Sequence, residues 1–292
     1  MVLVAGYRRS LSFPNHPNYS VKPGKTLHVR STSLPCRTHP IISQLKDEIN
    51  EVKSWCSKSD NPTSIWLCNG LNRLKIVHES LDDLLQLPQT QESVSDQLIE
   101  KLLEDFLRFV DVYGIFQMLV LTLKEEFMAA QVAVRRRDES KMSIHLKNLN
   151  KMAKDMSKLV STVQSIGKYS IPDNEAEITD IIRDVIQVTV SVSMELFRRI
   201  STSFSLQKPS CMGLSFGKKA KKVKMDEAIE EFEQLNLEKL WSLKKKGDEE
   251  AKMVSKKLHQ LEDCIVQIEG CGETTFRSLK NTRVSFLNLL TQ

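Results

Sequence analysis

The sequence predicts an all-α fold, an elongated helical bundle with long coiled-coil-like helices and a disordered N-terminal tail. Apolar residues recur at alternating steps of four and three along most of the chain after residue 38, which is the period of helices that bury one side. Glycine (10) and proline (9) are few among the 292 residues, and most prolines lie outside the periodic segments. Residues 1–37 lack this period and are rich in Ser, Pro, Arg and Asn, which predicts disorder.

Two helices are expected after this tail. Thr38 as N-cap and Pro40 in the first turn predict the first helix, which residues 60–62 break. The second is expected from Thr63 to Leu87, and Pro88 ends it. The buried stripe of the first is predicted as Ile41, Leu45, Ile49, Val52 and Cys56, and that of the second as Leu67, Leu71, Leu74, His78, Leu81 and Leu85.

The longest periodic stretch, Glu92 to Arg137, begins after residues 89–91 and is roughly 70 Å long as a helix. Its uncharged centre, Val112 to Leu123, has 12 residues, fewer than the ~20 that span a bilayer. We therefore interpret this centre as the most enclosed part of the core. Residues 135–137, all Arg, close the helix, where cations suit its negative end; phosphate binding is the alternative. The predicted stripe is Leu98, Leu102, Phe106, Phe109, Tyr113, Phe116, Val120, Leu123, Phe127, Ala130 and Val134.

Two more helices are expected on either side of a turn at residues 169–174. Residues 175–204 show both an alternation typical of a strand and a longer helical stripe. We choose the helix, because no second strand exists to pair with it. The stripes are Met142, Leu146, Leu149, Ala153, Met156, Val160 and Val163, with outward lysines at 141, 147, 151, 154 and 158, and then Ile178, Ile182, Val185, Val192, Leu196 and Ile200.

The C-terminal part is expected to hold two helices. Asp226 begins one that fades at residues 244–247, and residues 248–290 show a coiled-coil pattern that Gly270 and Gly272 could kink. The predicted domains are a disordered basic tail (1–37), a helical bundle (38–204), a basic linker (205–224) and C-terminal helices packing on the bundle (225–292). The stripes are Ile229, Phe232, Leu235, Leu240 and Leu243, then Ala251, Val254, Leu258, Leu261, Ile265 and Ile268, continued by Phe276, Leu279, Arg283, Phe286 and Leu290.

The net charge of +5 is unevenly distributed. Residues 1–40 and 205–224 each hold six Lys or Arg and no acid, which leaves 30 basic and 37 acidic residues in the rest of the chain. A helical body with this excess of acid repels nucleic acid. We therefore expect no nucleic acid to bind the folded body.

The six cysteines form no C-x-x-C pair and follow no secretory signal, which indicates reduced thiols in an intracellular protein. Cys264 and Cys271 share a helical face, but two thiols without a nearby His are a poor zinc site. No cofactor is expected. The expected location is the cytoplasm, with the nucleus or a membrane surface as alternatives; an acid-free start also resembles an organelle transit peptide, which suits its prolines less well.

The tail carries the same short motif twice. Residues 9–14 and 30–35 both read R-S-x-S-x-P, with Arg9, Ser12 and Pro14 in one and Arg30, Ser33 and Pro35 in the other. This is the form of a phosphoserine site read by 14-3-3 proteins, and phosphate would add charge and acceptor oxygens for an Arg cluster. The motifs lie 21 residues apart, so a dimeric reader could bind both at once.

A lysine run in the linker leaves three interpretations open. It comprises Lys218, Lys219, Lys221, Lys222 and Lys224. It is a solvated linker, a nuclear-localisation signal, or a membrane-surface patch assisted by apolar residues and an acylated Cys211 just before it.

A single motif suggests an enzyme. Residues 213–217 spell G-x-S-x-G, but the nucleophile elbow requires a turn between a strand and a helix, with His and an acid in later loops. Here a lysine run follows, and His259, the one His downstream, lies in a predicted coiled coil. Nothing gathers acids, bases and nucleophiles at chemical spacing, so we expect no enzyme.

Four segments of the chain have a distinctive sequence: residues 28–40 read HVRSTSLPCRTHP, 84–91 read LLQLPQTQ, 133–137 read AVRRR and 276–290 read FRSLKNTRVSFLNLL. These segments resemble the BYPASS-like family of land plants, a family of unknown function. The resemblance implies a helical plant protein of root and shoot development without established enzymatic activity, and it supplies no catalytic residues. Together these expectations describe a non-enzymatic adaptor or regulatory protein that acts through protein contacts. A peripheral membrane or trafficking factor that uses the basic linker is the alternative.

Overall fold

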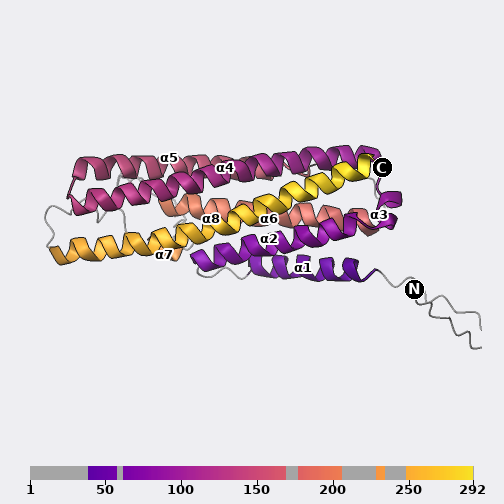
Figure 1. Ribbon diagram of the computed structural model, residues 1–292, viewed down its shortest axis with the longest axis horizontal. Helices are drawn as coiled ribbons and strands as arrows, with labels where there is room; N and C mark the ends of the chain where they lie inside the picture. The colour runs from indigo at the N-terminus through magenta and orange to yellow at the C-terminus, as the bar shows by residue number, and fades with distance from the viewer. Residues whose placement is uncertain (1–38, 58–61, 169–176, 206–227, 234–247, 292) are drawn as a thin grey trace, which may run out of the picture. The chain divides into compact units, whose positions relative to one another are not determined.

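A computed structural model describes residues 39–57, 62–168, 177–205, 228–233 and 248–291 (Figure 1). The chain divides into two units, Met1–Arg37 and Thr38–Gln292, and only the second contains described residues. Every element in these ranges is a helix, which confirms the predicted all-α class. The predicted disordered tail lies outside the described residues. The elements are α1 (Pro40–Ser57), α2 (Ser64–Leu85), α3 (Pro88–Ser93), α4 (Asp96–Arg135), α5 (Glu139–Gln164), α6 (Glu177–Phe204), α7 (Glu230–Glu233) and α8 (Asp248–Thr291).

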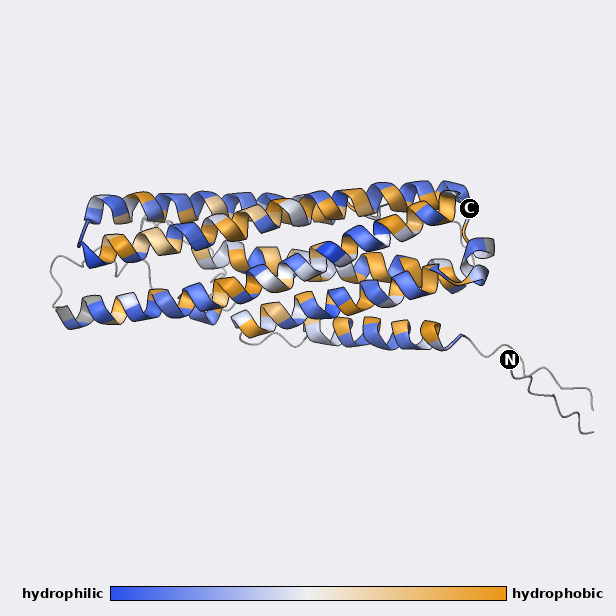
Figure 2. Ribbon diagram, in the orientation of Figure 1, coloured by the Kyte–Doolittle hydropathy of each residue, from blue (hydrophilic) through white to orange (hydrophobic). Residues whose placement is uncertain are grey.

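Five long helices of the second unit pack as a closed ring in the order α4, α5, α6, α2, α8, and α8 also contacts α4. Helix α1 lies outside this ring against α2 and α6. In Figure 2, hydrophobic and hydrophilic bands alternate along each long helix, as expected for helices that bury one side. The hydrophobic sides meet in one continuous core.

Helix ends follow the expected local chemistry. The Thr63 side chain accepts a hydrogen bond from the Trp66 N–H at 3.1 Å and so caps α2, and Asp138 caps α5 in the same way. Helix α4 ends at Arg135, and the chain reverses through Arg137, whose φ of 50° lies in the left-handed region. The three arginines thus close the helix, as predicted.

Helix α8 runs parallel to α2. The Thr275 and Thr282 hydroxyls, seven residues apart, approach the carbonyl oxygens of Leu71 and His78, also seven residues apart, at 3.0 and 3.5 Å. Both threonines are buried on the side of α8 that faces α2, whereas Gly272, also buried, lies against Phe116 and Gln117 of α4.

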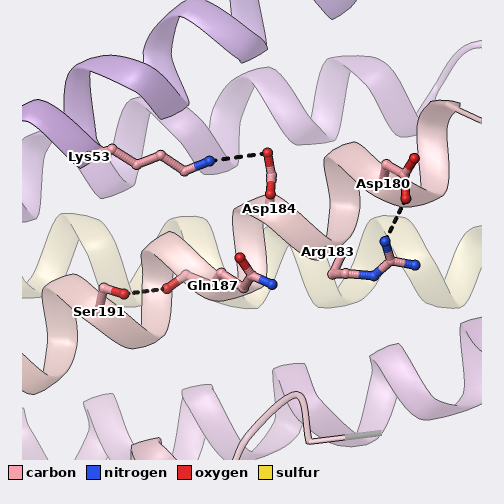
Figure 3. A network of polar contacts seen from close by, with 6 residues as sticks. All are labelled: Lys53, Asp180, Arg183, Asp184, Gln187 and Ser191. Atoms are coloured by element: carbon pink, nitrogen blue, oxygen red, sulfur yellow. Dashed lines mark hydrogen bonds and ion pairs between the residues drawn. The ribbon is translucent and has the colours of Figure 1, made fainter. Parts of the chain in front are cut away.

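Salt bridges tie α1 to the outside of α6. Lys46 pairs with Glu177 at 2.5 Å and Lys53 with Asp184 at 3.2 Å, one heptad apart on both helices, so these two helices are parallel. Figure 3 shows the second pair beside an Arg183–Asp180 pair within α6. These side chains are exposed, and such pairs contribute about 0–1 kcal/mol each.

Most predicted stripes are confirmed. All positions predicted as buried in α2, α4 and α6 are buried. Residues 177–204 form helix α6 and not a strand, as predicted. In α5 the one exception is Val160, which is half-buried. The predicted lysines on the outer side of α5 are exposed.

Several details of the predicted elements are wrong. In α1 the predicted Leu45, Ile49 and Val52 are buried, but at the ends of the stripe Ile42 and Trp55 are buried in place of the half-buried Ile41 and Cys56. The stripe is therefore shifted by one residue at each end, because both positions of each pair are apolar. Trp55 is drawn inward by stacking on Trp66, with ring centroids 4.0 Å apart.

Pro88 does more than end α2. It begins the short helix α3 and occupies its first turn, where its missing N–H costs nothing. The Thr90 hydroxyl donates to the carbonyl of Leu84 at 2.7 Å and fastens this helix to α2. The long helix α4 accordingly begins at Asp96, later than predicted.

The C-terminal helix also differs from the expectation. Helix α8 continues through Gly270 and Gly272 without a break. After Gly272 its buried residues include Thr275 and Thr282, whereas Phe276 is half-buried and Leu290 exposed. Of the helix predicted from Asp226, the described part is α7; residues 226–227 and 234–247 lie outside the described residues.

Candidate functional site

The site residues singled out in the sequence lie outside the part of the chain that the structure describes. The structure therefore brings none of them together, and each stays a prediction. They are Arg9, Ser12, Pro14, Arg30, Ser33 and Pro35 of the tail motifs, the lysines 218, 219, 221, 222 and 224, and the G-x-S-x-G residues 213–217.

The bundle interior contains a buried histidine. His78 is fully buried, with its Nε2 3.1 Å from the hydroxyl of Thr189. That hydroxyl donates to the carbonyl of Val185 at 2.7 Å, so it accepts from the Nε2–H of His78. Burial lowers the pKa of His78 to about 3, so the ring is neutral at pH 7. Its role is structural, because it has no access to substrate.

Tyr113 makes a second interior polar contact. Its hydroxyl lies 2.9 Å from that of Ser193, which donates to the carbonyl of Thr189 at 2.6 Å. Burial raises the pKa of Tyr113 well above its usual value. This contact joins α4 to α6 across the core and, like the contact of the His78 Nε2, pairs a group that would be costly to leave unpaired. The Nδ1 of His78 has no hydrogen-bond partner among the described residues.

Two thiols of the described helices, Cys56 and Cys68, pack against the bundle core. Cys68 of α2 lies beside Cys271 of α8, and burial raises its pKa to about 12. Burial likewise raises the pKa of Cys56 to about 11. Nucleophilic cysteines need a lowered pKa, because the thiolate is the reactive form. In the described ranges no three His, Cys, Asp or Glu side chains are grouped so as to hold a metal ion.

A half-buried polar cluster joins α4 to α5. Glu126 accepts a hydrogen bond from the Asn148 amide at 2.8 Å and contacts the Nδ1 of His145 at 2.7 Å. Since both side chains of α5 contact Glu126 of α4, the cluster ties these two helices together. It contains no nucleophile, and we assign it a structural role.

The outer face of α4 is the unusual surface of the bundle. Its exposed apolar side chains retain between 40% and 63% of their accessible area. By length and composition alone α4 could cross a membrane. Within its most apolar 18-residue window, 39% of the helix is buried inside the bundle. The inner stripe of α4 supplies its contacts with the bundle core, and the exposed outer residues lie outside that core. We call this surface the α4 outer face: Leu107, Ile115, Met118, Leu121, Met128 and Val132.

The outer face corrects the interpretation of Val112 to Leu123 as the most enclosed part of the core. Phe116 and Val120 are buried, but Ile115, Met118 and Leu121 on the opposite side are exposed. A run without charge indicates burial on both sides only if other helices cover both sides. Here the ring of helices covers one.

The α4 outer face, apart from Ile115, follows a helical repeat. Positions 107, 111, 114, 118, 121, 125, 128 and 132 alternate steps of four and three. Two of them are the exposed acids Asp111 and Glu125, and neither forms an ion pair in the described part of the chain. The surface is therefore an apolar stripe with two negative charges set into it.

The face extends toward α8. Lys124 pairs with Glu269 at 2.8 Å, and the Gln131 amide donates to Glu262 at 3.0 Å, so α4 and α8 are antiparallel. Val266 lies between these two contacts on α8, opposite the segment of α4 that carries Met128, and both side chains are exposed.

Sequence reasoning missed this face, although the signal was present. The same alternation of four and three that marked the inner stripe also runs through Leu107, Met118 and Val132. Two apolar stripes on one helix predict two contacts, and the outer stripe remains exposed among the described helices.

Comparison with known proteins gives one match. A family model described as Protein BPS1 matches residues 70–289. This range includes α3 to α7, most of α2 and nearly all of α8. No curated protein and no solved structure matches the chain.

Proposed function

Since the chain belongs to the BPS1 family, which implies a protein related to plant development, we propose that it is a non-enzymatic adaptor or regulatory protein. The α4 outer face carries this proposal. Contiguous exposed apolar surface is typical of sites that bind other proteins, and α4 already has a full set of core contacts without it. The interior polar groups described above are engaged in structural contacts, which favours a binding role over catalysis.

The phosphorylatable tail adds a regulated contact to this proposal. Phosphate on Ser12 and Ser33 would create two sites for a dimeric 14-3-3 protein, read through Arg9 and Arg30. The folded body would bind one partner protein through the α4 outer face. Phosphorylation of the tail would determine when the 14-3-3 protein joins this complex. The excess of acid outside the two basic segments supports the proposal that the body has no nucleic-acid partner. The proposed location is the cytoplasm.

A peripheral membrane factor is the second candidate. The lysine run at 218–224 would supply cations to an anionic surface, and the apolar outer face of α4 would supply hydrophobic area. The two acids in that face oppose contact with anionic lipid, which makes this the weaker proposal.

The test is affinity purification of the full chain from plant tissue, with and without phosphatase treatment. The matched variants are Met118→Glu on the outer face and Ile65→Glu on α2, whose side chains are 63% and 64% exposed. We expect partners that Met118→Glu loses and Ile65→Glu keeps, and a 14-3-3 protein that phosphatase removes. Recovery of the chain with membranes, reversed by salt, would instead favour the second candidate.

A further inference from the structure

We propose that the α4 outer face binds an amphipathic partner helix that carries two cations about two heptads apart. The inference rests on the proposed function and names the chemistry of the partner. Its basis is the combination of helical spacing, exposed apolar side chains and two unpaired acids on one surface.

The spacing selects a helix as the occupant. Leu107, Met118, Leu121, Met128 and Val132 occupy five of eight positions that alternate steps of four and three, and Asp111, Gly114 and Glu125 occupy the other three. A second helix with the same period can place its side chains between them. Such helix-in-groove recognition uses anchors at i, i+3, i+4 and i+7. An extended segment, with its period of two, would match this repeat poorly.

The two acids select the charge of the occupant. Asp111 and Glu125 are 14 residues apart on this face, or about 21 Å along the helix axis. The neighbouring cations are already engaged, since Arg108 pairs with Glu104 at 2.5 Å and Lys124 with Glu269 at 2.8 Å. A partner helix with Lys or Arg at matching spacing would complement the acids and gain a fixed register.

The same charges disfavour a second copy of the chain. Met118 is seven residues from each acid, so an antiparallel pair of α4 helices centred there would set Asp111 against Glu125 of the other copy. A parallel pair would set each acid against its own equivalent. Both arrangements oppose like charges, which destabilises the contact.

A lipid surface is disfavoured for a related reason. The acids would face the headgroups, and anionic headgroups attract cations, not carboxylates. Interfacial helices that bind such lipids carry Lys and Arg beside their apolar face. The charge pattern of the α4 outer face is the reverse of theirs.

The probe for the test is a synthetic amphipathic helix of four heptads, with Leu at the alternating positions and Arg at the two positions that face the acids. A control peptide carries Glu in place of both Arg. We expect the full chain to bind the Arg peptide about tenfold more tightly than the Glu peptide in titration calorimetry, since two exposed pairs change sign between them. Raising the salt concentration should narrow this difference.

Variants of the chain locate the contact. The double variant Asp111→Lys with Glu125→Lys should reverse the preference and bind the Glu peptide more tightly. Met118→Glu should weaken both peptides at least tenfold, and Ile65→Glu should change neither. Circular dichroism checks that each variant folds, which we expect because all four positions are exposed.

Four results would overturn the inference. Equal binding of the two peptides would show that the face does not select cations, and binding unaffected by Met118→Glu would show that the peptide binds elsewhere. Binding of vesicles with one-fifth phosphatidylserine, lost on Met118→Glu, would assign the face to lipid. Self-association in sedimentation, lost on the same change, would assign it to a second copy.

The failure of this inference is distinct from failure of the proposed function. If the full chain captures tissue proteins that Met118→Glu retains, the adaptor proposal stands and another surface binds them. If neither the chain nor its variants capture any protein specifically, the adaptor proposal itself fails.

Discussion

On its inner face α4 carries five fully buried aromatic rings, whereas its outer face carries aliphatic and methionine side chains in solvent. The inner rings interlock with those of other helices; Phe116, for example, lies 5.2 Å from Phe197 between ring centroids. Rigid aromatic rings specify one arrangement, while flexible methionines adapt to different partners. The comparison therefore separates a face that holds the fold from one that is available for binding.

The largest expected effect is on the inner face. Phe116→Ala removes a fully buried ring that contacts Tyr113 and Phe197, and the resulting cavity should lower the free energy of unfolding by about 3–5 kcal/mol. Urea unfolding followed by circular dichroism measures this loss. A loss below ~1 kcal/mol would mean that the inner face is not the main source of stability.

The next effect concerns the contact between α4 and α8. A Cβ at Gly272 would lie 2.9 Å from the ring of Phe116 and would also meet the Gln117 amide, whereas one at Gly270 would meet nothing within 4 Å. Gly272→Ala should therefore lower the free energy of unfolding by about 1–3 kcal/mol through overpacking. Gly270→Ala should raise it by up to about 1 kcal/mol, because alanine favours the helix.

The same urea experiment serves both glycine variants, and each is the control for the other. Equal effects of the two changes would contradict the close approach of α8 to the inner edge of α4.

A third effect is the response of the interior to pH. The pKa of His78 falls from 6.5 to about 3 because of burial. In the unfolded chain His78 is therefore protonated below pH 6.5, whereas in the native chain it is protonated only below about pH 3. The stability from neutral His78 is present above pH 6.5 and falls by about 1.4 kcal/mol per pH unit below it.

Asp82, one helical turn from His78, acts in the opposite sense. Burial raises its pKa from 3.8 to about 6, although hydrogen bonds from Thr282 and Ser285 lower it in part. The stability it contributes is complete below pH 3.8 and is lost as the pH rises through 6, so it offsets part of the histidine effect on acidification. Asp82→Asn should steepen the loss of stability between pH 6 and 4, and His78→Gln should flatten it. Unfolding curves across this range that coincide for the two variants would contradict this assignment.

Much of α4 could be predicted from the sequence, because its inner stripe is regular and rich in large apolar residues. The outer face could not, since the period of a helix does not say which of two apolar stripes the rest of the chain covers. Where two adjacent residues are both apolar, as at Ile41 and Ile42, only tertiary packing decides which one is buried. The closed ring of helices is a long-range property of this kind, so the open side of α4 emerges only with the structure.

The smallest expected effect on stability is on the outer face itself. Met118 is 63% exposed, so Met118→Glu should change the free energy of unfolding by less than about 0.5 kcal/mol. The same urea assay used for Phe116→Ala measures it, with Ile65→Glu as the control of matched exposure. Phe116 would then contribute several-fold more than Met118 to the free energy of unfolding. For partner binding we expect Met118 to contribute more than Phe116. A loss above ~2 kcal/mol would show that Met118 belongs to the core and would remove the distinction between the two faces.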